Sequence, residues 1–279
     1  MANVRVISDS SCDLPEELVR RLDIEIVSLS IRFGEEEFTD RVDLTPAEFW
    51  AKCKASKTLP ATAAPSPGSF QSAYERALAS GCDGVIVLTL SAALSATHQA
   101  AVLASEAVAG KIAVRIVDSQ AASMALGLLV LDVAEMAQTG ASLEELGEHA
   151  EALISKVGVI AMLDTLEHLV KGGRVGGARA LIGQVLAIKP LIELSNGVVA
   201  EAGRQRTRAK ALAAIVAVVR THTPLRRMAV VHGDSSELKA LEALIADIPI
   251  EFALIVADMG PTVGTHGGPG IIGVAWLET

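Results

Sequence analysis

The segment that decides the fold class is VIVLTLSAALSATHQAAVLASEAVA, residues 85–109. It begins with an uncharged β-prone run from Val85 to Leu90, which is typical of a buried strand, and continues as a helix that runs towards Ala109. A further β-prone run follows from Ile112 to Val117. Strand, helix and strand in this order predict parallel strands that are joined by crossover helices.

The same alternation extends over the first half of the chain, where further strands are expected at Val4 to Ile7 and Ile24 to Leu29. Helix starts are also readable, because a Ser or Thr with Glu three residues later caps a helix and Pro favours its first position. These starts are Thr45-Pro46-Ala47-Glu48, Ser142-Leu143-Glu144-Glu145 and Ser66-Pro67, and the helix-ending glycines are Gly81, Gly110 and Gly140. We therefore expect an α/β domain with a mainly parallel sheet over residues 1–156.

The pattern changes after about Lys156. Asn196-Gly197 separates two β-prone runs, Pro190 to Leu194 and Val198 to Ala202, and predicts a hairpin because both turn residues must adopt positive φ. The other expected elements are a strand at Val159 to Leu163, short helical pieces around Gly172-Gly173, a helix from about Arg208, a strand at Met228 to Val231, a helix opened by Asp234 with Glu237, and strands near Phe252 to Val256 and Ile271 to Trp276. Together they predict a second, α+β domain with a mixed or antiparallel sheet over residues 157–279.

The composition excludes several classes of protein. Of 279 residues, 51% are hydrophobic and 20% are charged, with 23 Gly, 10 Pro and 3 Cys, so the chain is neither disordered, collagen-like nor disulfide-rich. The longest apolar stretches end at Asp132 and Arg220, short of the ~20 residues that cross a bilayer, and no integral membrane segment is expected. The N-terminus does not resemble a signal peptide, and the three cysteines lack metal-ligand spacing, which favours a cytoplasmic protein.

The net charge of −9 would repel nucleic acid, and aromatic residues make up only 3%, so nucleic acid is not an expected partner. Basic residues nevertheless gather from Lys171 to Lys210, which contains eight of them and only two acidic residues. This segment is interpreted either as a solvated helix face or as a docking patch for an anionic ligand head or an acidic partner.

Four segments place hydroxyls, glycines or a histidine where strands end or helices begin. Ser8 to Pro15 follows the first strand, where open α/β sheets bind ligands, although its Asp and Ser side chains would equally cap the next helix. In the loop after Pro60, Thr62 has the only side chain before Pro65 that can form a hydrogen bond.

The other two segments contain Ser95 and His266. Ser95 opens the helix after the Val85 to Leu90 run, where unpaired N–H groups attract an anion or are capped. The segment Gly264 to Gly270 has four glycines, which permit close backbone approach to a ligand, and its histidine supplies a titratable donor.

Common enzyme motifs do not fit these segments. Gly268 to Gly273 matches the letters of the dinucleotide fingerprint, but only six residues follow it, too few for a crossover helix. The sequence has no Gly-x-Ser-x-Gly elbow, phosphate-binding loop or metal-spaced His pair, so neither a cofactor nor a metal is expected. Hydroxyls, glycines and one histidine suit holding an anion better than breaking a bond.

Two alternatives to a simple anion carrier stay open. One is a hydrolase or transferase that acts on a small acyl substrate, with His266 as acid or base and Ser95 or Ser10 as nucleophile. The other is a structural or regulatory binding module.

Six motifs span almost the whole chain: Asp9 to Pro15, Thr62 to Pro67, Leu94 to Thr97, Leu166 to Val175, Ile188 to Leu191 and His266 to Gly270. In this order and spacing they resemble the DegV family of bacterial fatty-acid-binding proteins. The chain departs from the usual family pattern at Ala63 and Ala64, where a polar pair is common, and at Ala96, where Gly is common.

The resemblance implies a DegV-like fold of two domains, with an acyl chain in a tunnel and its carboxylate at the end nearer the surface. It also implies that Thr62, Ser95 and His266 contact the carboxylate. Residues implied less directly, in ligand binding or partner docking, are Ser10, Arg174, Arg204, Arg206, Gly267 and Gly268.

The implied function is that of a cytoplasmic lipid carrier that has no catalytic activity itself. It would bind a long-chain fatty acid without a covalent bond and present the carboxylate to a fatty acid kinase with a dihydroxyacetone-kinase-like domain. Burying a methylene group gains ~0.8 kcal/mol, so a sixteen-carbon chain gains on the order of 10 kcal/mol before ordering costs. The carboxylate must then be met by hydrogen-bond donors, because burying it unpaired is costly.

Overall fold

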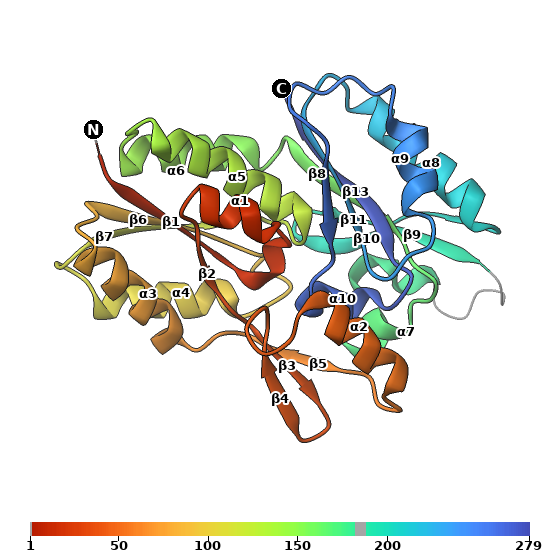
Figure 1. The fold of residues 1–279 in the computed structure, drawn as a ribbon, viewed down its shortest axis with the longest axis horizontal. Helices are drawn as coiled ribbons and strands as arrows, with labels where there is room; N and C mark the ends of the chain where they lie inside the picture. Colours follow the sequence, from red (N-terminus) through yellow and green to blue (C-terminus); the bar gives the residue numbers. More distant parts are fainter. Residues whose placement is uncertain (1, 182–187) are drawn as a thin grey trace.

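The computed structural model describes residues 2–181 and 188–279. Two large sheets are separated by the long helix α5 (Met124–Gln138), which contacts strands of both (Figure 1). The residues of α5 from Met124 to Ala134 are all buried, because the helix is covered on both sides. The largely apolar sequence here, in which Asp132 is the one charged residue from Met124 to Ala134, therefore reflects a position between two layers.

The first sheet is parallel throughout, with the strand order β2-β1-β6-β7. Its strands are β1 (Val4–Asp9), β2 (Glu25–Val27), β6 (Gly84–Thr89) and β7 (Ala113–Asp118). Figure 1 shows helices on both faces: α3 (Pro67–Ala79) and α4 (Thr97–Ala107) on one, α5 and α6 (Leu143–Leu153) on the other. Two short helices follow β1, namely η1 (Ser10–Cys12) and α1 (Glu16–Arg21).

A small antiparallel sheet in the first half was not predicted from the sequence. Its strands, in the order β4-β3-β5, are β3 (Ser30–Phe33), β4 (Glu36–Thr39) and β5 (Ala61–Ala63), and α2 (Pro46–Ala55) connects β4 to β5. These strands have three or four residues each, too few to show an alternating pattern. The strand expected from Ile24 to Leu29 is correspondingly shorter, ending at Val27, and the chain then turns into β3.

The second sheet is mixed, with the order β10-β9-β8-β13-β11-β12. Its strands are β8 (Val157–Met162), β9 (Lys189–Ser195), β10 (Val198–Gln205), β11 (Leu225–His232), β12 (Ile255–Asp258) and β13 (Ile272–Glu278). Only the β11–β12 pair is parallel among the described strands of this sheet. The helical elements of this half are α7 (Glu167–Lys171), η2 (Gly176–Leu181), α8 (Arg208–Thr221), α9 (Leu238–Ile245) and α10 (Pro261–Gly267).

The predicted fold class is confirmed, and so are most of the local signals. Thr45 and Ser142 form capping boxes, and Ser66 caps α3. The β9–β10 hairpin turns at Asn196 and Gly197, both with positive φ. The change from the first sheet to the second falls between Leu153, where α6 ends, and Val157, where β8 begins. A division into domains at 156/157 stays a prediction.

Two local predictions were wrong. The helix expected at Asp234 begins at Leu238, because Asp234 adopts a left-handed backbone with φ of 52° and its carboxylate lies 2.6 Å from Nζ of Lys54. The segment from Gly264, expected as a glycine-rich loop, lies largely in α10, which Pro261 opens at the first helical position. His266 is therefore held on a helix.

Candidate functional site

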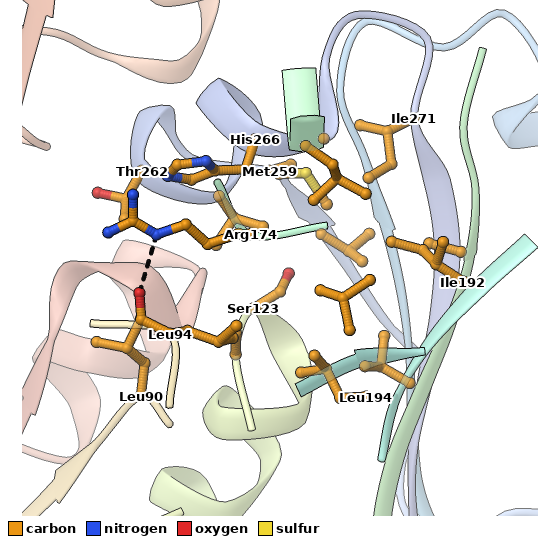
Figure 2. Close-up of a pocket in the computed structure, with 18 of the residues that line it drawn as sticks. Leu90, Leu94, Ser123, Arg174, Ile192, Leu194, Met259, Thr262, His266 and Ile271 are labelled. Carbon is orange, nitrogen blue, oxygen red and sulfur yellow. Dashed lines mark hydrogen bonds between the residues drawn. The ribbon is translucent and has the colours of Figure 1, made fainter. Parts of the chain in front are cut away.

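An apolar hollow lies between the second sheet, α10 and the segment that follows β6 (Figure 2). Its cavity volume is about 110 Å³. Its aliphatic lining residues are Leu29, Leu90, Leu94, Val159, Leu169, Ile192, Leu194, Val199, Val231, Val263 and Ile271. These residues come from both halves of the chain, so the hollow exists only in the complete fold.

The polar residues that line the hollow are Thr62, Ser95, Ser123, Arg174, Glu193, Thr262 and His266. Thr62, Ser95, Arg174 and His266 lie together at one end, which we call the polar end. Thr62, on β5, lies with its Oγ1 3.0 Å from Nε2 of His266 on α10. Figure 2 shows His266 beside Arg174, whose side chain extends to the carbonyl of Leu94. The predicted residues Thr62, Ser95 and His266 thus border one cavity, although they lie on three separate elements.

A second hollow adjoins this polar end and shares Thr62, Arg174 and His266 with the first. We call it the basic mouth, because its lining includes the exposed Lys57 and Lys171 and, among the described residues, no Asp or Glu. The three shared side chains therefore stand at a junction between an aliphatic interior and a basic, polar exterior. Such a junction suits an amphipathic anion.

His266 is neutral near pH 7. Burial, together with the neighbouring Arg174 and His168, lowers the pKa of its imidazole to about 4. Its Nδ1 is buried and has no hydrogen-bond partner among the described residues. A Cβ at Gly172 would collide with this nitrogen, so the glycine makes room for the ring. The imidazole can form hydrogen bonds here, but the positive charge must come from Arg174.

Arg174 connects α7 to the segment that carries Ser95. Its Nε donates to the carbonyl oxygen of Leu94 at 3.1 Å, and its Nη1 donates to that of Gly172 at 2.7 Å. These bonds hold the guanidinium at the polar end of the hollow. The expected role of Arg174 in ligand binding or partner docking stays a prediction.

Ser95 lies at the start of α4, half-buried at the wall of the hollow. Its Oγ accepts a hydrogen bond from the backbone N–H of Thr97 and lies 2.9 Å from Oγ1 of the same residue. Both readings of Ser95, capping and anion binding, are thus compatible with its position. Its hydroxyl proton is available to a ligand whenever Thr97 acts as the donor between the two hydroxyls.

The remaining candidates are dispersed. Gly267 lines the hollow, whereas Gly268 adopts φ of 78° and packs on the ring of His168. Arg204 and Arg206 are exposed at the end of β10, an outer strand of the sheet, and are not among the lining residues described. Ser10 is fully buried away from the lining, where its hydroxyl donates to Asp40 at 2.8 Å.

Two buried carboxylates that the sequence did not single out as site residues hold the wall of the hollow. Asp13 accepts hydrogen bonds from Oγ of Ser123 at 2.6 Å and from the N–H of Gly260 at 2.9 Å. Asp40 accepts from Thr262 as well as from Ser10. Ser123 and Thr262 both line the hollow. The carboxylates of Asp13 and Asp40 therefore support the wall through hydrogen bonds to these two residues.

Burial shifts the acidity of these carboxylates. It raises the pKa of Asp13 to about 7 and also raises the pKa of Asp40, although hydrogen bonds from their partners act in the opposite direction. No spacing in the sequence links Asp13 with Gly260 or Asp40 with Thr262, because each pair is more than two hundred residues apart.

Among the residues that the structure describes, no group of three or more His, Cys, Asp or Glu side chains has the geometry to hold a metal ion. Within the same ranges, no helix has both the length and the apolar character that crossing a membrane requires.

Comparison with known proteins identifies the family. Residues 3–279 match the model of the DegV family, which is described as "Uncharacterised protein, DegV family". A DegV domain-containing protein of Streptomyces coelicolor is 33% identical over 98% of this chain and 97% of its own length. A solved fatty-acid-binding DegV family protein from Thermus thermophilus is 34% identical, with a TM-score of 0.91 over 99% of this chain and 100% of its own.

A second solved structure gives the same result. DegV from Bacillus subtilis, described as a fatty acid binding protein, is 31% identical and has a TM-score of 0.89 over 100% of both chains. The match over nearly the full length, in sequence and in structure, confirms the resemblance that the six motifs indicated. This chain belongs to the DegV family.

Proposed function

We propose that this protein binds one long-chain fatty acid, with the acyl chain in the apolar hollow and the carboxylate at the junction with the basic mouth. The observation that carries the proposal is the continuity of an aliphatic cavity with a cluster of hydrogen-bond donors at one end. The relatives from Thermus thermophilus and Bacillus subtilis, which are described as binding fatty acids, support the same ligand class.

The energetics suit such a ligand. A palmitoyl chain gains on the order of 10 kcal/mol from burial of its methylene groups, and part of this gain offsets the entropy lost on binding. The carboxylate is met by Arg174, which supplies a charge, and by the hydroxyls of Thr62 and Ser95. Neutral His266 orients Thr62 through the 3.0 Å contact between Nε2 and Oγ1.

We further propose that the carboxylate is presented to a partner fatty acid kinase with a dihydroxyacetone-kinase-like domain, in the cytoplasm, where ATP is available. Lys57 and Lys171 in the basic mouth lie where an acidic surface or a nucleotide phosphate of the kinase would approach. Arg204, exposed on the outer strand β10, and Arg206, exposed just after that strand, are further candidates for docking.

The proposal assigns the chemical step to the kinase. Thr62 and His266 have the spacing of a nucleophile and a base, but the lowered pKa of His266 makes the imidazole a weak base. Its Nδ1 also lacks an orienting carboxylate among the described residues. A hydrolase or transferase that uses His266 as its base is therefore the less favoured reading.

The test begins with mass spectrometry of an organic extract from the purified protein. We expect a long-chain fatty acid at a stoichiometry near one per chain, and delipidated protein should bind added palmitic acid. Protein that carries no lipid and does not bind palmitic acid would contradict the proposal.

The kinase role is tested separately, by the formation of acyl phosphate with a purified fatty acid kinase and ATP. Lys171→Glu should slow this reaction without changing lipid retention. Lys239→Glu on α9, which is 88% exposed and outside the basic mouth, is the matched control. Equal rates for both variants would argue against docking at the mouth, and acyl ester turnover that is lost in His266→Ala would favour the enzyme alternative.

A further inference from the structure

Two aliphatic residues, Val159 on β8 and Leu194 on β9, form part of the hollow's wall. The two strands pair Ala161 with Ile192 and Ile160 with Glu193 in antiparallel register. Beyond this pairing, Val159 pairs with Ala275 of β13, and Leu194 pairs with Val199 of β10. Because side chains alternate between faces, the pair of Val159 and Leu194 lies on the same face as Ala161 and Ile192, and all four residues line the apolar hollow.

Another cavity lies beyond this pair, which we call the outer hollow. Its cavity volume is about 600 Å³, and its described lining has only Val159 and Leu194 in common with the apolar hollow. Its remaining lining includes the exposed Glu151, Ser155 and Asn196, so it is open to solvent. The two side chains therefore separate an aliphatic interior from a polar space outside.

This wall is held in place on two sides. Leu194 precedes the hairpin turn, where the hydroxyl of Ser91 donates to the carbonyl oxygen of Gly197 at 2.7 Å. A Cβ at Gly197, which has φ of 77°, would lie 2.6 Å from the same hydroxyl oxygen, so the hairpin and the segment after β6 are in close contact. The wall thus belongs to a paired sheet and an anchored turn, both of which resist displacement by a ligand.

Val159 and Leu194 also lie across the hollow from the residues proposed to bind the carboxylate. Arg174 and His266 are shared with the basic mouth, whereas Val159 and Leu194 are shared with the outer hollow. Figure 2 shows Leu194 and His266 on opposite sides of the space that the lining residues enclose. An acyl chain fixed at Thr62 and Arg174 would extend towards the Val159–Leu194 pair.

We propose that the Val159–Leu194 pair is the stop that sets the longest acyl chain this protein accepts. The proposal rests on the proposed function, since it assumes a carboxylate fixed at the junction. Up to the stop, each added methylene group raises affinity about fourfold. Past it, the tail must bend or displace a rigid wall, and affinity ceases to rise. Removing the Leu194 side chain joins the two hollows and lets a longer tail continue outwards.

The experiment measures the affinities of delipidated protein for myristic, palmitic, stearic, arachidic and behenic acids by competition against a fluorescent fatty acid. In Leu194→Ala, the ratio of affinities for arachidic over palmitic acid should rise at least tenfold, roughly the gain from two methylene groups. In Leu194→Phe the same ratio should fall, and the preferred chain should become shorter. Val159→Ala is the second enlarging variant, used where Leu194→Ala does not fold.

Leu191→Ala is the matched control, because it removes the same side chain from the same strand but from the opposite face. It should leave the chain-length profile unchanged. A ratio that stays within twofold of the wild-type value in a folded Leu194→Ala or Val159→Ala variant overturns the stop. If wild-type protein binds none of the five acids, the proposed function fails, and the proposed stop fails with it. If the wild type binds fatty acids but the variants keep its chain-length ratio, only the stop fails, so the two failures are distinguishable.

Discussion

The two faces of the six-stranded sheet differ in packing although the same strands supply both. On one face, Ile160 and Leu191 are 0% and 2% exposed and pack with residues of α8 and α9 in a continuous core. On the other face, their neighbours Val159 and Leu194 are only half-buried, because they border the apolar hollow. Alternation along a strand decides which face a side chain joins, but the elements above that face decide whether it is packed.

The covering helices explain the difference. Helix α8 contacts β8, β9 and β10, whereas α5 contacts β8, β11 and β13 on the opposite face. The part of the sheet near β9 and β10 therefore borders the hollow on its second face. Aliphatic side chains that face a void lose dispersion contacts, which makes the hollow face the less stable one until a ligand fills it.

Replacing one leucine on each face is expected to give the largest contrast. Leu191→Ala should lower the free energy of unfolding by about 2–5 kcal/mol, since it creates a cavity in a packed core. Leu194→Ala should cost about 1 kcal/mol in lipid-free protein, because part of that side chain already lacks neighbours. Urea titration of both variants measures the difference. Equal losses would show that the hollow face is packed in solution.

Removing head-group donors should reduce ligand affinity rather than stability. Ser95→Ala and Thr62→Val each remove a hydroxyl expected to bond a carboxylate, so each should weaken palmitic acid binding by roughly tenfold to a hundredfold. Ser105→Ala, which changes a half-buried serine on α4 outside the lining, serves as the control. Isothermal titration calorimetry on delipidated protein measures the affinity of each variant for palmitic acid. Affinities that match the Ser105 control would remove both residues from the head-group site.

The histidine at the polar end predicts a dependence of stability on pH. Because folding lowers the pKa of His266 from 6.5 to about 4, the unfolded chain binds more protons in this interval, and stability falls as pH decreases through it. His266→Gln removes this contribution and should lose less stability between about pH 7 and pH 5 than the wild type.

The carboxylate of Asp13 has the opposite sign. Its pKa is raised to about 7 by burial, so its contribution to stability is full below its unfolded pKa and is lost as pH rises through about 7. The wild type and His266→Gln both contain Asp13, so its contribution to the pH dependence of stability cancels when the two proteins are compared. Chemical denaturation at a series of pH values measures the free energy of unfolding of the wild type and of His266→Gln. If this free energy changes with pH in the same way in both proteins, His266 is more solvated than its buried position implies.

The smallest effects are expected at the outer strand. Arg204→Ala and Arg206→Ala change exposed side chains that are not among the described lining residues, so stability should stay within about 0.5 kcal/mol of the wild type and lipid retention should not change. Only the rate of the kinase reaction should fall. A loss of bound lipid in either variant would place these arginines in the ligand site instead.

Local signals predicted much of the fold. The uncharged run at Val85 to Leu90 became the buried strand β6, and the capping boxes at Thr45 and Ser142 began α2 and α6 where expected. Such signals succeed because they depend on residues close in sequence. The small sheet with β5 escaped prediction, since its strands are too short to show a period and β3 pairs with β5 across a long connection.

The site was predicted only in part, for the same reason. Family motifs pointed to Thr62, Ser95 and His266, but the sequence did not show that Asp13 bonds Gly260 over 247 positions. Nor could composition distinguish Leu194 at the hollow from Leu191 in the core, because both are leucines on one strand. Which face is left uncovered depends on how distant helices pack, and that is a property of the whole chain.

The most direct test of the central claim is a crystal structure of delipidated protein after reconstitution with palmitic acid. The account predicts continuous density in the apolar hollow, with the carboxylate within hydrogen-bond distance of Thr62 Oγ1 or Ser95 Oγ and close to Arg174. An empty hollow, or an acyl chain bound elsewhere on the protein, would contradict it.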